Sequence, residues 1–281
     1  MTIEVNNSGT WTAPRVYINN SGTWTEPNEI HVNDSGTWKL VYKKVDVTSS
    51  TQNININTLM GSPSYPLTAV VNISGSLTIG SSSTSTPAIT TSGLPAGSKV
   101  YLVIGSGTYV VGAGGSGGGR VAGRGDNGPA KAGTAGGSAL YTRVTTYLEN
   151  NGTIGGGGGG GGGGSRTNTG SQAYDDFTGA GGGGAGNSVG GVQPGSGPSG
   201  NPGTLTTGGA GVPYWSNPGS SEQQIGSIGG NGGNLGAAGS PGVPWPGVDG
   251  TNSGGAAGNA IDGVSYVTKK VAGTITGGQV N

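Results

Sequence analysis

The residues whose side chains could do chemistry are few, and their spacing does not assemble a catalytic set. Asp175 and Asp176 are adjacent carboxylates that could bind a cation or form an acid/base pair, but no third ligand lies near them in the sequence. His31 is the single histidine and cysteine is absent, so neither a Ser–His–Asp triad nor a metal site of His or Cys ligands is expected. The sequence predicts a protein that is not an enzyme and that has no catalytic residue, no cofactor and no metal.

Two short motifs match known patterns without indicating a function. Residues 112–117 fit the dinucleotide-binding pattern G-x-G-x-x-G, but 67 of the 281 residues are glycine, so chance explains the match. The strand–helix–strand unit and the later acidic partner that this pattern needs are both missing. Arg124-Gly125-Asp126 is an integrin-type tripeptide, and we interpret it as a polar turn between two glycine runs.

The composition and the N-terminal sequence argue against several other classes of protein. The 12 basic and 12 acidic residues give zero net charge and make up 9% of the chain, whereas a nucleic-acid-binding surface needs clustered Lys and Arg. No apolar run approaches the ~20 residues of a membrane helix, so membrane insertion is not expected. The start, MTIEVNNSGTW, has neither a basic nor an apolar signal region, and we expect synthesis in the cytoplasm without a signal peptide.

The elements that would position a binding surface begin with a threefold repeat. IEVNNSGTW, VYINNSGTW and IHVNDSGTW each contain alternating apolar residues, a turn signal and a tryptophan, and the tryptophans are Trp11, Trp24 and Trp38. The pattern predicts three hairpins with a glycine in each turn. The tryptophans either pack on one another as a small core, or they lie exposed and dock on a partner with threefold symmetry.

We expect a mostly β and irregular fold with little or no α-helix. Residues 53–57 (NININ) alternate strictly, and residues 99–111 are the most apolar stretch and predict a buried strand pair. Residues 138–154 predict a strand that ties the glycine-rich part to this β region. The predicted domains are an attachment domain at 1–45, a β linker region at 46–111 and a glycine-rich domain at 112–281.

Glycine-rich runs dominate the last of these domains, at 112–119, 132–137, 155–164, 179–191, 195–203, 226–239 and 250–260. A linker would need a single run or runs of arbitrary length, whereas several runs of similar length favour a lattice. Extended threefold helices rise ~3.1 Å per residue and can exchange backbone hydrogen bonds with neighbouring helices. Only glycine, which has no Cβ, lets the backbones come close enough for this. The run of ten consecutive glycines, expected to be a central rod, is Gly155, Gly156, Gly157, Gly158, Gly159, Gly160, Gly161, Gly162, Gly163 and Gly164.

Several of these features together resemble one known family. The SGTW repeats, the join LENNGTIGGGGGGGGGG, the interrupted glycine runs and the closing GNAIDGVSYV resemble the receptor-recognition adhesin of T-even-like bacteriophages, which caps the distal tip of the long tail fibre. The resemblance implies an N-terminal domain whose tryptophans sit on the trimeric distal fibre subunit, and a C-terminal sandwich of polyglycine II helices with protruding loops. It places one copy at each fibre tip of the virion, where variable loops bind a host outer-membrane protein (or lipopolysaccharide) and set host range.

The resemblance also assigns roles to residues. Attachment falls on Trp11, Trp24 and Trp38, and the lattice falls on the glycine runs. Receptor binding falls on the inserts between runs, with the candidates Tyr174, Asp175, Asp176, Phe177, Tyr214, Trp215 and Trp245. Aromatic residues among small polar ones on a rigid frame are typical of a paratope, although these aromatics could instead only cover the ends of the rods.

Rods that alternate in direction would place inserts 120–131, 165–178 and 204–225 at the far end of the bundle. The same count puts 240–249 at the near end, although VPWPGVD there is typical of a recognition loop, and the sequence leaves this conflict open.

Two other functions fit parts of the sequence. A fibre assembly chaperone would use the same tryptophan repeats, and a structural or antifreeze-type glycine-rich protein would use the same lattice. The long aromatic inserts favour an adhesin over both.

Overall fold

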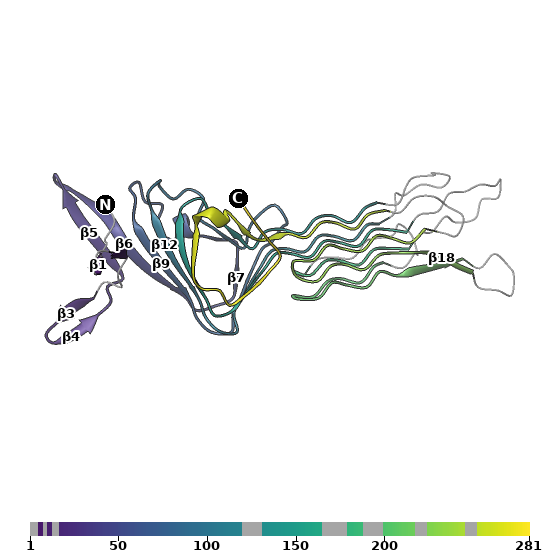
Figure 1. The fold of residues 1–281 in the computed structure, drawn as a ribbon, viewed down its shortest axis with the longest axis horizontal. Coiled ribbons are helices and arrows are strands. Elements are labelled where there is room, and N and C mark those ends of the chain that lie inside the picture. The colour runs from purple at the N-terminus through teal and green to yellow at the C-terminus, as the bar shows by residue number, and fades with distance from the viewer. Residues whose placement is uncertain are drawn as a thin grey trace.

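The protein is elongated, with three structurally different parts along its length. The structure is a computed structural model that describes residues 5–7, 10–12, 17–119, 131–164, 179–187, 199–216, 224–244 and 252–281. Short hairpins lie at one end, a block of β-sheets follows, and a bundle of extended segments runs toward the other end (Figure 1). Helix in the described chain is limited to α1 (Ile56–Leu59) and a single 3-10 turn, η1 (Val264–Tyr266). The predicted mostly β fold with little α-helix is confirmed.

The N-terminal repeats form three antiparallel hairpins. Their strands are β1 (Val5–Asn7) with β2 (Thr10–Thr12), β3 (Ile18–Asn20) with β4 (Thr23–Thr25), and β5 (Glu29–Asp34) with β6 (Thr37–Val47). Each repeat is therefore one hairpin, and in the second and third repeats a Ser-Gly turn reverses the chain after the alternating apolar strand. The long strand β6 continues from the third hairpin into the central sheets.

The central block is a solenoid with three faces, each of them a parallel sheet. The first sheet contains β6, β9 (Thr68–Ile73), β12 (Lys99–Ile104), β15 (Thr145–Asn150) and β20 (Val267–Val271), with antiparallel β5 on its edge. The second contains β7 (Thr51–Gln52), β10 (Thr78–Gly80), β13 (Tyr109–Val111), β16 (Thr153–Gly155) and β21 (Thr274–Thr276). The third contains β8 (Ile54–Asn55), β11 (Ile89–Thr90), β14 (Leu140–Tyr141), β19 (Asn259–Asp262) and β22 (Gly278–Val280).

Ladders of apolar side chains from the three sheets fill the inside of the solenoid. Ile79, Val110 and Ile154 are in register on the second sheet, and all three are buried. Leu102 and Leu148 stack in the same way on the first sheet. Truncating such a buried side chain to alanine lowers the free energy of unfolding by about 2–5 kcal/mol. This core therefore stabilises the solenoid from which the hairpins and the glycine-rich segments extend.

The glycine-rich segments are insertions at one corner of the solenoid. Each turn of the chain passes from the second sheet to the third, and the connection there differs greatly in length. Residues 81–88 make this connection in one turn, 112–139 in the next and 156–258 in the one after. The two longest connections extend away from the solenoid as the bundle seen in Figure 1.

This topology divides the chain differently from the predicted domains. Strand β6 crosses the boundary expected at residue 45, and strands from 138–155 and 259–280 lie in the solenoid rather than in a separate glycine-rich domain. Residues 99–111 form β12 and β13, which lie in different sheets and do not pair with each other. The reason is that a parallel strand finds its partner only after the chain has made a crossover, so neighbours in space are distant in sequence.

The ten-glycine run lies inside the bundle and is hydrogen-bonded to six neighbouring segments. Its amides point to three neighbours in turn, so every third glycine donates to the same neighbouring segment. Gly157, Gly160 and Gly163 donate to 131–137, and Gly158, Gly161 and Gly164 donate to 179–187. Gly159 and Gly162 donate to 237–243. Its carbonyls accept from 112–119, 229–236 and 252–258. A backbone with three residues per turn points its amides in three directions, which is why one run can bond to so many neighbours.

Neighbouring backbones leave no space for a side chain on this run. A Cβ added at Gly157 would lie 1.9 Å from the carbonyl oxygen of Ala113. Segments at the edge of the bundle do carry side chains, but on their outward positions, as exposed Thr134 and Ala135 do between Gly133 and Gly136. Glycine therefore occupies most positions where one backbone faces another, although the small side chains of Ala180 and Ala185 are also buried in the bundle.

Segment 199–204 runs back toward the solenoid, and not outward as the count of alternating runs predicts. Gly183 donates to the Asn201 carbonyl at 2.9 Å and Gly186 to the Thr204 carbonyl at 2.9 Å, so this segment lies parallel to 179–187. Thr204 and Thr207 then form a turn at the near end, where the Thr207 amide donates to Thr204 Oγ1 at 3.0 Å. The prediction that all of 204–225 lies at the far end is wrong for this turn.

The glycine run predicted at 226–239 contains two segments instead of one. Residues 229–235 return to the solenoid, and Gly236, with a φ of +66°, turns the chain beside Gly277. Residues 237–243 then run outward, because Gly159 and Gly162 donate to the carbonyls of Ala237 and Ser240 in succession. The additional reversal takes the chain to the far end at residue 243, so the near-end position counted for 240–249 is wrong for residues 240–244. Residues 245–249 lie outside the described residues.

Candidate functional site

The second and third hairpins are built on identical turns. Ser21 and Gly22 have φ values of 52° and 87°, and Ser35 and Gly36 have 53° and 88°. Two successive residues with positive φ form the tight turn that fits the twist of a hairpin. In the second hairpin the Gly22 amide donates to Asn19 Oδ1 at 2.8 Å, and the third repeats this bond between Gly36 and Asn33 at 2.9 Å.

Each hairpin also places its tryptophan in the same register. Trp11 lies opposite Asn6, Trp24 opposite Asn19 and Trp38 opposite Asn33. The side chains of Trp24 and Trp38 are 65% and 67% exposed, so these two do not pack into a small core; the side chain of Trp11 lies outside what the structure describes. Large exposed aromatic side chains are typical of sites that a partner covers.

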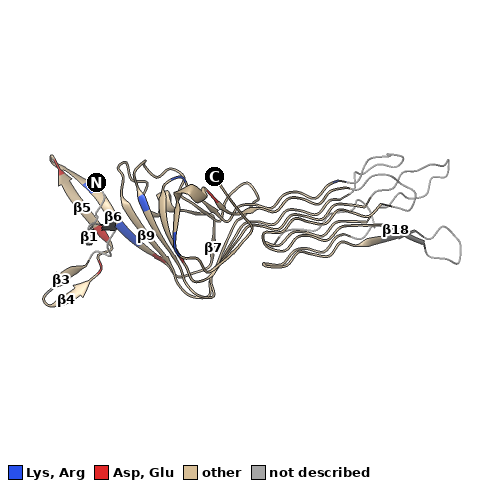
Figure 2. Ribbon diagram, in the orientation of Figure 1, with Lys and Arg blue, Asp and Glu red and all other residues tan. Residues whose placement is uncertain are grey.

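Ion pairs brace the third hairpin. Lys39 Nζ lies 2.5 Å from Asp34 Oδ2, and Lys43 Nζ lies 2.8 Å from Glu29 Oε1. The hydrogen bond from Lys39 lowers the pKa of Asp34, and the one from Lys43 lowers the pKa of Glu29. Lys39 also lies 4.3 Å from the centre of the Tyr65 ring. Exposed pairs of this kind are individually weak. Among the described residues, most charged side chains lie on the hairpins and the solenoid (Figure 2).

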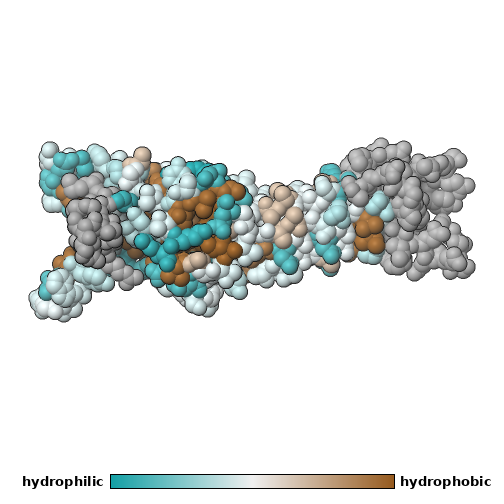
Figure 3. All heavy atoms as spheres, viewed as in Figure 1, coloured by the Kyte–Doolittle hydropathy of each residue, from teal (hydrophilic) through white to brown (hydrophobic). Residues whose placement is uncertain are grey.

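The far ends of four glycine-rich segments are joined by backbone hydrogen bonds. Ile228 and Val243 exchange two of these bonds, at 3.1 and 2.8 Å. Val212 accepts one from Gly229 at 3.1 Å and donates one to Ala180 at 2.9 Å. Val243 is 54% exposed, and Figure 3 shows a small apolar area at this end of the bundle.

A hairpin of β17 (Pro213–Ser216) and β18 (Gln224–Ile228) continues outward from this end. It carries two of the predicted receptor-binding residues, Tyr214 and Trp215, and Trp215 lies opposite Ile225 in the hairpin. The bonds between Ile228 and Val243 bring the chain that leads to Trp245 beside this hairpin. Trp245 itself lies outside the described residues, as do Tyr174, Asp175, Asp176 and Phe177.

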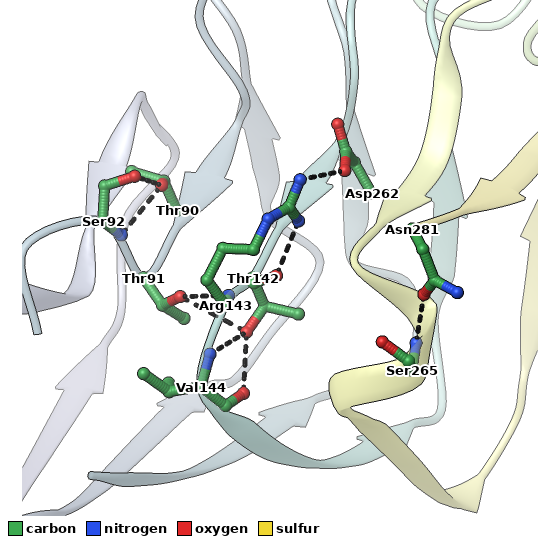
Figure 4. Close-up of polar contacts among 9 residues, drawn as sticks. All are labelled: Thr90, Thr91, Ser92, Thr142, Arg143, Val144, Asp262, Ser265 and Asn281. Atoms are coloured by element: carbon green, nitrogen blue, oxygen red, sulfur yellow. Dashed lines mark hydrogen bonds and ion pairs between the residues drawn. The ribbon is translucent and has the colours of Figure 1, made fainter. Parts of the chain in front are cut away.

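A polar cluster that the sequence did not predict lies on the solenoid at the end of the third sheet (Figure 4). Arg143 Nη2 lies 2.8 Å from Asp262 Oδ1, and Arg143 Nη1 donates to the Thr142 carbonyl at 2.8 Å. The guanidinium lies 4.1 Å from the centre of the Tyr141 ring. The hydrogen bond to Asp262 raises the pKa of Arg143. No sequence signal pairs these residues, because Asp262 reaches Arg143 only after the insertion 156–258.

The described parts of the chain contain no group of three or more His, Cys, Asp or Glu side chains arranged to hold a metal ion. None of their helices has the length and apolar character that a membrane span requires.

Comparison with known proteins gives two matches. Residues 42–280 match the family described as phage tail fibre adhesin Gp38. The chain is also similar to the crystal structure of the gp37-gp38 adhesin tip complex of the bacteriophage S16 long tail fiber, at 25% sequence identity and a TM-score of 0.56. This similarity covers 84% of the present chain and 82% of the other. No curated protein sequence matches.

Proposed function

Because the chain belongs to the phage tail fibre adhesin Gp38 family and is an adhesin of the tail-fibre tip, we propose that it links a fibre to a host cell through its two ends. The three hairpins attach to the distal subunit of the trimeric long tail fibre, with one copy at each tip. Loops at the far end bind an outer-membrane protein, or lipopolysaccharide, of the host and so set host range. The role is structural, and the proposal contains no catalytic step.

One observation carries the proposal, which is that the tryptophan hairpins and the far ends of the glycine-rich segments lie at opposite ends of the molecule (Figure 1). Exposed Trp24 and Trp38 are suited to fill pockets in a partner. Three hairpins with the same register suit a threefold partner, because equivalent units then meet equivalent surfaces. The S16 structure is a complex of gp37 with gp38, which supports the same kind of assembly here.

We assign the glycine-rich segments to the polyglycine II type and give Gly155–Gly164 the role of a central frame. Support comes from backbone bonds that repeat every three residues and reach six neighbouring segments. A stiff frame lowers the entropy cost of ordering the loops when they bind. Because the frame uses no side chains at its centre, loops can change in sequence without disturbing it.

Two measurements test the proposal. Mass spectrometry of gradient-purified virions should detect the chain, whereas its absence from virions would identify a chaperone that is released after assembly. Labelled full-length protein should bind host cells, and binding should be lost in a host strain that lacks one outer-membrane protein or the lipopolysaccharide outer core. If the protein is present on virions but binds no host cell, the receptor-binding part of the proposal is wrong.

A further inference from the structure

A row of polar side chains crosses the outer surface of the third sheet. Thr90 is in register with Tyr141, and Tyr141 with Asp262, on the parallel strands β11, β14 and β19. Their neighbours Leu140 and Ile261 are buried in the core, so the row faces outward, because side chains alternate along a strand. Adjacent strands are about 4.8 Å apart. The row therefore offers a hydroxyl, a phenol and a carboxylate within reach of one small ligand.

The row is the floor of an open pocket of about 400 Å³. The loop 81–88 forms one wall, and Ser92 and Ser138 complete the lining. Every lining residue except Pro87 and Asp262 carries a hydroxyl group. The volume falls within the ~300–1,000 Å³ that is usual for sites that bind small molecules.

Arg143 fixes two of the three groups of the row, Tyr141 and Asp262. It holds Asp262 through Oδ1 at 2.8 Å (Figure 4). Its guanidinium also lies 4.1 Å from the centre of the Tyr141 ring. The carboxylate thus keeps its second oxygen, Oδ2, for a ligand. The positive charge of Arg143 is balanced by Asp262, and its Nη1 is used by the Thr142 carbonyl, so the pocket has no spare cation for an anionic ligand.

The hydroxyl groups around the row are also held in place. Thr90 Oγ1 donates to Ser92 Oγ at 2.9 Å and accepts from the Ser92 amide at 3.1 Å. In the wall, Ser83 Oγ lies 3.1 Å from both Ser85 Oγ and Thr86 Oγ1. Groups that are ordered before a ligand arrives reduce the entropy cost of binding.

We propose that this pocket binds a neutral sugar ring. Sugar hydroxyls both donate and accept hydrogen bonds, as the Ser and Thr hydroxyls of the lining do. Asp262 Oδ2 accepts from a sugar hydroxyl in a charge-assisted bond, which is stronger than a bond between neutral groups. Tyr141 adds an aromatic ring with a polar hydroxyl end. The pocket lies beside the near end of the bundle, where Thr84 meets Gly137, so it is separate from the loops proposed to bind the receptor.

The test uses the full-length protein and no fibre or host cell. Saturation-transfer NMR is recorded with the methyl glycosides of glucose, galactose, mannose and N-acetylglucosamine at millimolar concentrations, and the glycoside with the strongest transfer is titrated for its Kd. Asp262→Asn and Thr90→Val should each weaken binding. Asp262→Asn should raise the Kd by about tenfold, because a hydrogen bond to a charged group is lost. Asp46→Asn is the matched control, since Asp46 lies on the first sheet and accepts a hydrogen bond from Asn72.

The proposal is overturned if none of the four glycosides gives saturation transfer. It is also overturned if Asp262→Asn, with a melting temperature equal to that of Asp46→Asn, binds the glycoside as tightly as the control does. Should Asp262→Asn lose stability through Arg143, the Thr90→Val variant decides, because it removes one hydroxyl and leaves the ion pair intact.

Discussion

Gly160 and Ser116 approach so closely that a Cβ on Gly160 would lie 1.9 Å from the Ser116 carbonyl oxygen. The Gly160 amide also donates to the Thr134 carbonyl at 2.9 Å, and the Thr134 amide donates to the Ser116 carbonyl at 3.0 Å. These three residues belong to three different segments, each held by the other two. A side chain at Gly160 therefore cannot be accommodated by moving one neighbour.

We expect Gly160→Ala to lower the free energy of unfolding by about 3 kcal/mol or more, since overpacking costs 1–3 kcal/mol even where side chains can adjust. Chemical denaturation of the full-length protein measures the change. Ala256→Ser is the control, because Ala256 is exposed on an outer segment, and it should change stability by less than about 0.5 kcal/mol. Equal stability of the two variants would show that the segments are not close-packed in solution.

At the edge of the bundle, asparagine side chains take the place of a missing neighbour. Asn231 Oδ1 accepts from the Gly211 amide at 3.0 Å, and Asn234 Oδ1 accepts from the Gly208 amide at 3.1 Å. The two asparagines are three residues apart, and so are the two glycines, which is one repeat of the threefold helix. The asparagine side chains therefore bond to successive amides that would otherwise face solvent.

Removing both caps should leave an edge that can pair with another chain, as an unprotected strand edge does. We expect the double change Asn231→Ala and Asn234→Ala to lose about 1 kcal/mol per hydrogen bond and to self-associate in size-exclusion chromatography with light scattering. Ser253→Ala, at an exposed position of another outer segment, should remain monomeric and as stable as the wild type. A monomeric, fully stable double variant would mean that water satisfies these amides equally well.

How far the sequence predicts the fold depends on whether a signal is local. The hairpin turn at Ser35 and Gly36 is contained in four adjacent residues, and the sequence predicts it. The row of Thr90, Tyr141 and Asp262 is not visible in the sequence, because parallel neighbours are separated by whole insertions. The sequence does not predict the turn at Gly236 for a different reason: the positive φ of this glycine leaves no mark in the sequence that separates it from the glycines of the runs around it.

Trp24 and Trp38 should contribute to fibre attachment without contributing to stability. Both are about two-thirds exposed, so Trp24→Ala and Trp38→Ala remove little buried surface from the free protein. If each fills a pocket on the fibre, either change should weaken attachment by roughly 30-fold, which corresponds to a hot-spot loss of about 2 kcal/mol. Surface plasmon resonance with the purified fibre tip measures the effect.

Tyr266→Ala is the control for this measurement, because Tyr266 is an aromatic residue that is 41% exposed on the solenoid. It should attach at wild-type strength. Attachment that is unchanged in both tryptophan variants would remove the second and third hairpins from the fibre interface.

The third hairpin should loosen in acid. The pKa values of Asp34 and Glu29 are lowered by Lys39 and Lys43, so the carboxylates stabilise the folded hairpin fully above the ordinary carboxyl pKa near 4 and lose this effect as the pH falls through the lowered values. NMR of the Trp38 indole should shift in this acid range. In Asp34→Asn with Glu29→Gln the shift should vanish, and a shift that persists would have to come from another group.

Loop replacements can distinguish the two ends of the bundle. The loops there lie elsewhere than a count of alternating glycine runs predicts. Residues 243 and 252 lie at the far end, whereas the turn at 204–207 lies against the solenoid. We therefore expect replacement of 245–251 by glycine and serine to abolish binding of labelled protein to host cells, because in the proposed function Trp245 is one of the aromatic anchors and such anchors supply much of the affinity. The near-end control, in which Leu205 and Thr206 are replaced by glycine and serine, should leave cell binding unchanged, and flow cytometry measures both. Loss of binding in the near-end variant alone, at unchanged melting temperature, would reverse this assignment of the ends.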